Sequence, residues 1–262
     1  MSKRQITMKR AILIAALLVA TTAARGQQVQ PQLWHSDAKD SAEWVVERYL
    51  RLMNIEGLER DSILYMESTI VYASAPTDTA ILKRWFLPPN RFRSEMWHKD
   101  TLLEGLYTDG KKLHREINNT NLVYWMHITE SRYYDQVRPY DFRGPLYSWR
   151  ADGAELTYQG VWKMEGSDVY RIYVETPDRY NTYYLFEKGS GLLFLEQTTE
   201  GHSAYSNHQA KAFAGLHGIH EYLPIGKALL PSVESYQTKD DMLIYRTTYR
   251  YVPLDMKVFT ED

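Results

Sequence analysis

Residues 79–117 read TAILKRWFLPPNRFRSEMWHKDTLLEGLYTDGKKLHREI and decide the fold. They hold four short segments of strand-like composition, and turn residues stand at each join: Pro88-Pro89-Asn90, Lys99-Asp100 and Asp109-Gly110. Asp-Gly between two such segments is a strong signal for a β-hairpin. We therefore expect an antiparallel meander with strands at 79–87, 91–98, 101–108 and 111–117.

Strand-like segments continue on both sides of this stretch, at a spacing of roughly 8 to 12 residues that is typical of an all-antiparallel sheet. The segment at 155–164 shows the clearest alternation of apolar and polar residues. We expect further strands at 63–72, 122–128, 155–164, 169–175, 180–186, 192–197, 230–236 and 242–251. The fold class that follows is mainly β, with the strands in an antiparallel sandwich or barrel.

Two helical regions accompany the strands. Between Asp40 and Gly57, apolar residues recur at helical spacing: Ala42, Val45, Val46, Tyr49, Leu50 and Met53. Residues 129–153 break the strand pattern, and we expect short helices at 131–137 and 145–151, with Gly153 just past the end of the second. Because this insertion is rich in aromatic residues, it is suited to cover an open sheet.

The N-terminus has the pattern of a secretory signal peptide. Lysines and arginines between Lys3 and Arg10 precede an apolar run from Ala11 to Ala20, and small residues follow. The run is about half the roughly 20 residues that a membrane-spanning helix needs, which makes a retained membrane anchor the weaker alternative. We expect residues 1–26 to be removed and residues 27–262 to form a single domain.

Charge and composition exclude several classes of protein. Removal of residues 1–26 takes away five positive charges and moves the formal net charge from −2 to −7. An acidic chain without a block of lysine and arginine lacks the basic surface that nucleic acids and anionic membranes need. The chain contains no cysteine, which excludes disulfides, thiolate metal sites and an N-terminal lipidated cysteine. We expect a soluble protein in an exported compartment.

The sequence lacks the common catalytic motifs, including the G-x-S-x-G elbow, the phosphate-binding glycine loop and H-E-x-x-H. Four histidines gather late in the chain, at His202, His208, His217 and His220. Imidazoles in that number are able to hold zinc, but Gly218 between the last two does not favour the helix that would bring them onto one face. We expect solvated loop histidines, no metal, no cofactor and no enzymatic activity.

Several stretches together resemble the LolA/LolB-like superfamily of lipoprotein carriers. The resemblance spans nearly all of residues 27–262, and it is closer to the diverse relatives of the carrier than to the carrier itself. The stretches that carry it are Leu50–Asp61 with the strand segment after it, Leu87-Pro88-Pro89-Asn90-Arg91-Phe92-Arg93, Tyr107–Lys112, Leu156–Gly160, Tyr183-Tyr184-Leu185, Leu229–Ser232 and Pro253–Phe259.

The resemblance implies an incomplete antiparallel β-barrel, that is, a half-barrel covered by the N-terminal helix and the helical insertion. It also implies a periplasmic protein whose hollow binds a lipid or a lipoprotein acyl chain. Arg91 and Arg93 follow the proline turn where the family often has arginine, and they are candidates for a gate or for contact with a head group. By alternation, the inner face of the half-barrel draws on Trp85, Leu87, Phe92, Met96, Leu102, Leu106, Leu156, Tyr158, Trp162 and Met164.

Those ten side chains either line a cavity or fill a solid core, and both alternatives stay open. With a cavity, the expected function is binding of a hydrophobic ligand, as a lipoprotein carrier or sorting factor. An alternative is an envelope-sensing or protein-interaction module on the same fold, with an envelope protein as its partner. A metal-dependent enzyme built on the histidine cluster is the weakest alternative.

Overall fold

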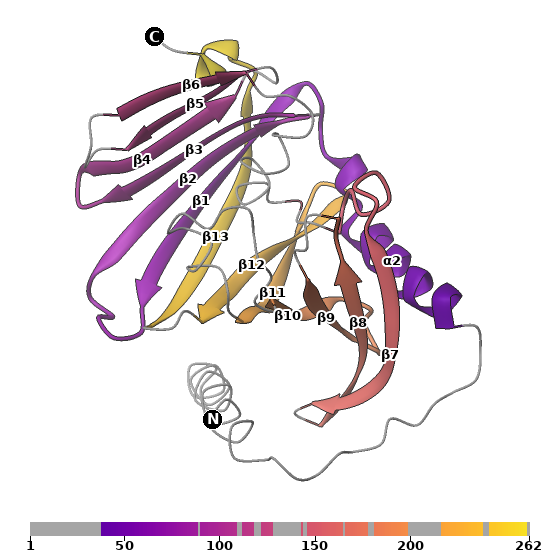
Figure 1. Ribbon diagram of the computed structural model, residues 1–262. Helices are drawn as coiled ribbons and strands as arrows, with labels where there is room; N and C mark the ends of the chain where they lie inside the picture. The colour runs from indigo at the N-terminus through magenta and orange to yellow at the C-terminus, as the bar shows by residue number, and fades with distance from the viewer. Residues whose placement is uncertain are drawn as a thin grey trace. The chain divides into compact units, whose positions relative to one another are not determined.

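The computed structural model describes residues 38–88, 90–108, 112–117, 122–127, 143, 146–164, 166–177, 181–198, 216–237 and 241–260 (Figure 1). These residues all belong to one compact unit. The predicted signal peptide, the expected helix at 131–137, and His202 and His208 lie outside the described residues.

A single antiparallel sheet of thirteen strands makes up most of the described chain. The first six strands follow one another in sequence, and the last strand, β13, pairs with β1. In the described structure the edge strands β6 and β7 do not pair with each other, so the sheet is an open half-barrel and the predicted fold class is confirmed. From one edge to the other, the strands are β6 (Leu122–His127), β5 (Lys112–Ile117), β4 (Thr101–Thr108), β3 (Arg91–His98), β2 (Thr79–Leu87), β1 (Ser62–Tyr72), β13 (Met242–Pro253), β12 (Ala228–Gln237), β11 (Leu216–Ile225), β10 (Leu193–Thr198), β9 (Thr182–Glu187), β8 (Ser167–Glu175) and β7 (Glu155–Met164).

Every strand expected from the sequence is present, with ends that differ by at most two residues. The strand that the sequence analysis missed is β11, which it treated as a loop. Gly218 and Pro224 are poor strand residues, and the pairing of β11 with β12 shifts register on both sides of Glu221. These interruptions break the alternation by which the other strands are recognised.

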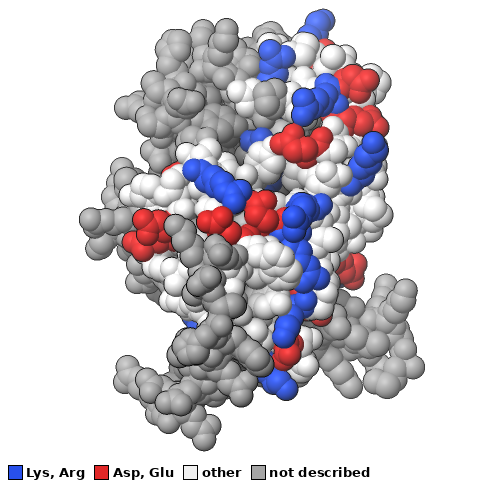
Figure 2. All heavy atoms as spheres, turned by 90° about the vertical axis from the view of Figure 1, so that its right-hand side faces the viewer, with Lys and Arg blue, Asp and Glu red and all other residues white. Residues whose placement is uncertain are grey.

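The long helix α2 (Ala38–Met53) covers one face of the sheet. It begins two residues before the expected start at Asp40 and ends at Met53, after which η1 (Ile55–Gly57) continues the chain. Its apolar stripe is buried and packs against β7 and β12. Figure 2, which faces the side of Figure 1 that carries α2 and β7, shows basic and acidic side chains intermixed over this side. The helix is therefore amphipathic, with its charged face toward solvent.

The expected helix at 145–151 is replaced by a turn. The backbone N–H of Ala154 donates to the Trp149 carbonyl and the N–H of Gly153 donates to the Arg150 carbonyl, with Gly153 at a φ of +68°. This is the bonding pattern of a helix C-terminus that ends on a glycine, but the described segment holds a single turn because so short a helix does not repay its nucleation cost. Leu146 and Trp149 are buried in the same cluster as α2.

The opposite face of the sheet is covered near one end by the C-terminal turn η3 (Met256–Phe259). Phe259 packs there with Ile63 and Leu87 in a second, smaller cluster. A ladder of cationic and aromatic side chains crosses this face, with one directly paired residue from each of six neighbouring strands: Arg250, Tyr65, Trp85, Arg93, Tyr107 and His114.

Candidate ligand-binding face

We define the inner face of the sheet as the face against which α2 packs. It carries Leu64, Met66 and Phe86 in one buried cluster with the helix. Strand register extends this assignment, because Phe86 pairs with Leu64 on one side and with Phe92 on the other, and paired residues project to the same side of a sheet. The outer face is the side that carries η3.

Under α2 the inner face is a filled core. Ile172, Tyr184 and Phe186 are each no more than 2% exposed. The ring of Tyr49, from α2, lies 5.4 Å from the ring of Phe186, measured between centroids. In this region the apolar side chains of the sheet and helix pack against one another.

An edge pocket of about 200 Å³ opens where η1 meets the end of β2. Ile55, Leu58 and Phe86 belong both to this pocket and to the buried cluster, so its apolar part is continuous with the core. Tyr147 donates a hydrogen bond to Glu56 at the polar part, and burial followed by this carboxylate raises the pKa of Tyr147. The full lining is Ile55, Glu56, Leu58, Arg60, Phe86, Pro88, Arg143 and Tyr147.

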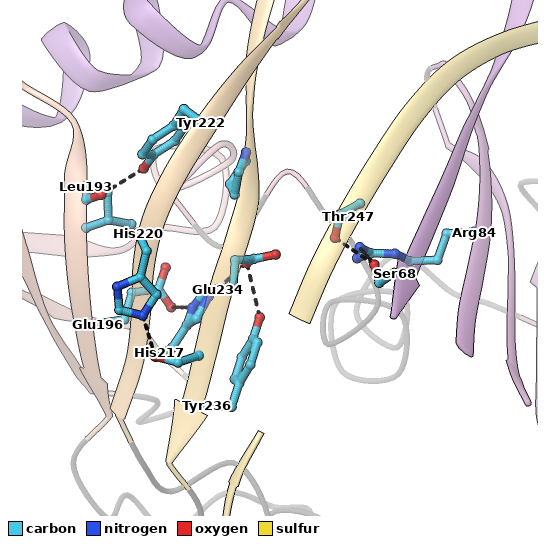
Figure 3. A network of polar contacts seen from close by, with 12 residues as sticks. Ser68, Arg84, Leu193, Glu196, His217, His220, Tyr222, Glu234, Tyr236 and Thr247 are labelled. Carbon is cyan, nitrogen blue, oxygen red and sulfur yellow. Dashed lines mark hydrogen bonds and ion pairs between the residues drawn. The ribbon is translucent and has the colours of Figure 1, made fainter. Parts of the chain in front are cut away.

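A charged network lies on β10, β11 and β12 (Figure 3). His217 Nδ1 is 3.0 Å from Glu196 Oε2, and His217 Nε2 is 2.9 Å from Glu234 Oε1. Because an ionised carboxylate only accepts hydrogen bonds, both ring nitrogens donate and His217 is an imidazolium. The ring of Tyr236 stacks on that of His217 with centroids 4.1 Å apart.

The electrostatics of this network agree with its geometry. Burial lowers the pKa of His217, but the charges and hydrogen bonds of Glu196 and Glu234 outweigh burial and raise it to about 10. Burial raises the pKa of Glu234, whereas the hydrogen bond and charge of His217, with the charge of Arg84, lower it below its usual range. The side chains of His217, Glu196 and Glu234 are only 16%, 20% and 12% exposed. His217 and Glu234 are therefore ionised, and the three side chains are largely shielded from water.

The prediction that His217 and His220 are solvated loop residues is wrong. Both lie on β11, and His220 Nε2 meets Ser235 Oγ at 2.8 Å while His217 is held by carboxylates. Within the described ranges, no group of three or more His, Cys, Asp or Glu residues is placed to hold a metal ion. The two histidines serve different contacts and do not converge on one ligand.

A second polar group lies on the inner face of β1, β2 and β13. Arg84 Nη2 donates to Ser68 Oγ at 3.3 Å, and Ser68 Oγ is 2.7 Å from Thr247 Oγ1 (Figure 3). Ser68 and Thr247 are buried. Nothing in the sequence analysis singled out Arg84, although its alternation with Leu82 and Phe86 on one strand was a readable signal of an arginine on an apolar face.

The structure brings half of the ten predicted ligand-contact residues onto the inner face. They pack on the buried cluster or pair in register with its members: Phe92, Met96, Leu106, Leu156 and Tyr158. Whether they contact a ligand stays a prediction.

The other predicted residues lie elsewhere for identifiable reasons. Trp85 and Leu87 are on the outer face, because Phe86 between them faces inward and β2 is apolar on both sides. Register shifts move the rest: Leu102 opposes Trp97 across a bulge in β4, and a shift between Tyr158 and Val161 turns the end of β7 over. The residues displaced by that second shift are Trp162, which is 41% exposed, and Met164.

The two arginines proposed as a gate also lie on the outer face. Arg93 Nε donates to Glu95 Oε1 at 2.6 Å, and its guanidinium stacks over Trp85 in the cross-strand ladder. Arg91 pairs with Leu87 and contacts the sulfur of Met256. Contact between these arginines and a ligand on the inner face would require the ligand to pass around the sheet.

An outer-face groove of about 370 Å³ lies along the ladder, between it and Val252 and Val258. Arg93 is engaged there by Glu95 and by the Val258 carbonyl, and Arg250 lies 4.6 Å from the centre of the Tyr65 ring. Since the cations and rings of this groove are already paired with one another, the inner face is the better candidate for ligand binding.

Comparison with known proteins gives matches in structure but not in sequence. No protein-family model matches the chain, and no curated protein matches it. A LolA superfamily protein from Nitrosomonas europaea superposes with a TM-score of 0.54 at 9% identity, covering 84% of this chain and 97% of that one. This chain has a LolA-like fold. The resemblance expected from the sequence is therefore confirmed at the level of the fold.

Two further solved structures share this LolA-like architecture. A domain from Vibrio parahaemolyticus, described as an outer membrane lipoprotein-sorting protein, has a TM-score of 0.54 and 12% identity over 85% of this chain and 97% of its own. A DUF1329 family protein from Desulfovibrio piger has a TM-score of 0.56 and 12% identity over 86% of this chain and 98% of its own. Among the described residues of this chain, no helix is long and apolar enough to cross a membrane.

Proposed function

We propose that this protein is an exported carrier or receptor for a hydrophobic ligand and that it binds an acyl chain of a lipid or lipoprotein at the inner face of its half-barrel. It is a binding protein rather than an enzyme, and residues 27–262 form its one domain after removal of the signal peptide. The proposed location is the periplasm, with no lipid anchor, since the chain has no cysteine to carry one.

The edge pocket is the observation that carries the proposal. Its apolar lining of Ile55, Leu58 and Phe86 is continuous with the core, while charged side chains such as Arg60 and Arg143 stand at the same pocket. That combination suits an amphiphile, whose chain enters apolar surroundings while its polar end stays near charge and water. Each buried methylene contributes about 0.8 kcal/mol, so a chain of about 16 carbons gives on the order of 10 kcal/mol before ordering costs.

The structural relatives support the proposal in kind. Two of them are described as a LolA superfamily protein and an outer membrane lipoprotein-sorting protein. Because one fold hosts many functions, the ligand of this chain has to be argued from its own residues and tested on them.

Displacement of a fluorescent fatty-acid probe from the purified protein tests the proposal. Ile55→Trp places a large ring in the edge pocket without adding charge, and we expect it to weaken probe binding about tenfold, which is the effect of losing about two buried methylenes. Leu52→Trp is the matched control, because Leu52 is 40% exposed on α2 three residues earlier. If the wild type and Ile55→Trp are both folded and bind the probe equally well, the edge pocket is not the binding site.

A further inference from the structure

Arg84 is a cation on the inner face of the proposed ligand-binding sheet. Its direct register partners are Met66 on β1 and Ser94 on β3. Along its own strand it stands between Leu82 and Phe86, and Phe86 lines the edge pocket. Residues two apart on a strand are separated by about 6.6 Å, so Arg84 lies one side chain further along the inner face than the pocket.

The donors of Arg84 are largely unused. The Nε atom of Arg84 is buried and makes no hydrogen bond within the described structure. Among the described residues, the Arg84 guanidinium donates only to the hydroxyl of Ser68, through Nη2. Over the same described ranges, the Arg84 guanidinium has no carboxylate at ion-pair distance. A guanidinium offers five N–H donors, and leaving buried donors unmet costs free energy.

Hydroxyl groups gather beside these donors. Ser68 and Thr247 face each other across β1 and β13 at 2.7 Å between oxygens, and both are buried. Val233 on β12 pairs with Arg246, which places Ser232 next to Thr247 across that pair of strands. Ser232 is 5% exposed, and its Oγ is buried with no hydrogen bond in the described part of the chain.

The carboxylate whose pKa is lowered by the charge of Arg84 is committed to another partner. Glu234 lies close enough for the charge of Arg84 to help lower its pKa, but its carboxylate accepts hydrogen bonds from His217 and Tyr236. Within the described residues, Glu234 is therefore engaged by His217 and Tyr236, and the N–H donors of Arg84 make no hydrogen bond to a carboxylate oxygen. Figure 3 shows Arg84 directed at Ser68 and Thr247, apart from the His217 network.

We propose that Arg84, Ser68, Thr247 and Ser232 form an anion subsite that binds the carboxylate or phosphate headgroup of the acyl ligand. This inference rests on the proposed function and adds the headgroup class to it. Guanidinium donors and hydroxyls are the groups that recognise carboxylate and phosphate oxygens. From this subsite the acyl chain runs toward Phe86, two residues along β2, and into the apolar part of the edge pocket.

Calorimetric titration of the purified protein at pH 8 tests this subsite. The ligands are dodecanoate, 1-dodecanol and inorganic phosphate, and the proteins are the wild type, Arg84→Gln and Arg246→Gln. Arg246 is the matched control, since it is an exposed arginine one residue before Thr247 on β13 and pairs with Thr69 on the outer face. We expect the wild type to bind dodecanoate at least tenfold more tightly than dodecanol, Arg84→Gln to abolish that preference, and Arg246→Gln to retain it.

Arg84→Lys keeps the positive charge but loses the planar fork, so it should retain part of the preference; it also serves if the glutamine variant does not fold. An unchanged preference in Arg84→Gln, or equal losses for both ligands, would overturn the subsite while leaving the proposed function intact. Failure of the wild type to bind either amphiphile would overturn both. If the protein binds phosphate through Arg84 but does not bind dodecanoate, the subsite binds a free anion. That result would overturn the proposal that it binds a lipid headgroup.

Discussion

At the scale of single residues, the inner face of the sheet carries charged side chains that are largely buried. His217 is held between two carboxylates that are themselves shielded from water. Breaking such a buried arrangement by removing one partner is strongly destabilising, because the other charge is left without compensation. We therefore expect the network to set how stability depends on pH.

His217→Gln tests this dependence. The folded pKa of His217, about 10, lies above its ordinary value of 6.5, so the contribution of the imidazolium to stability is complete below pH 6.5 and is lost as the pH rises through 10. We expect the substitution to lower the free energy of unfolding by about 3 kcal/mol at pH 6 and by much less at pH 10.5. Urea unfolding at both pH values, by circular dichroism, measures the two differences.

His98→Gln is a suitable control for that experiment. His98 Nε2 meets Asp78 Oδ1 at 2.7 Å, but the two side chains are 31% and 44% exposed. Solvent screens an exposed pair such as this one, so this variant should lose little stability at either pH. A deficit of His217→Gln that is the same at pH 6 and pH 10.5 would contradict the assignment of His217 as an imidazolium.

At the scale of elements, α2 is tied to the turn between β9 and β10. Arg48 donates from Nη1 to the Lys188 carbonyl at 3.0 Å and from Nη2 to the Gly189 carbonyl at 2.8 Å. Gly191 in the same turn has a φ of +80°, and a Cβ there would lie 2.6 Å from Arg48 Nε. The turn thus requires glycine at 191 both for its backbone conformation and for the approach of the arginine.

Gly191→Ala should therefore lower the free energy of unfolding by about 2 kcal/mol, since it combines a disfavoured backbone conformation with displacement of Arg48. Gly189→Ala, two residues earlier, is the matched control, because its added Cβ meets nothing within 4 Å; we expect a change within about 0.5 kcal/mol. Thermal unfolding of both variants measures the contrast. Equal melting temperatures for Gly191→Ala and Gly189→Ala would show that the contact of Arg48 with this turn does not stabilise the packing of α2.

The elements were predictable from the sequence to different degrees. Turn residues and alternation located the strands on both sides of the turn predicted at Asp109-Gly110, and a helical stripe located α2. Alternation alone did not choose the face of β2, because Trp85, Phe86 and Leu87 are apolar in succession. It also failed at the end of β7, where Gly160 has a φ of +90° and the register shifts; a glycine inside a strand is a known sign of such a bulge.

The polar part of the candidate site was the least predictable. The partners of His217 come from β10 and β12, which lie 21 and 17 residues away in sequence, and β11 itself was not recognised as a strand. The role proposed for Arg84 depends on Ser68, 16 residues earlier on the neighbouring strand β1, and on Thr247, which lies on β13 beyond β1. Such constellations depend on strand order, which the hydrophobic pattern of a single chain does not specify.

At the scale of the whole molecule, the described chain is an open antiparallel half-barrel with a filled region under α2, an edge pocket, and the cation Arg84 on its inner face. These features support the proposal that it binds an amphiphile. The fold is shared with solved structures at 9 to 12% identity. At that distance the shared fold leaves the ligand undetermined, and the inner-face residues of this chain carry the argument.

Native mass spectrometry of the protein, recovered gently from the cells that produce it and followed by organic extraction, tests the central claim most directly. We predict a complex heavier than the polypeptide by one lipid or acylated peptide, released into the organic phase as an acidic amphiphile. A mass equal to that of the bare polypeptide, unchanged when lipids and lipoprotein are added, would contradict the account and favour a protein-interaction module on the same fold.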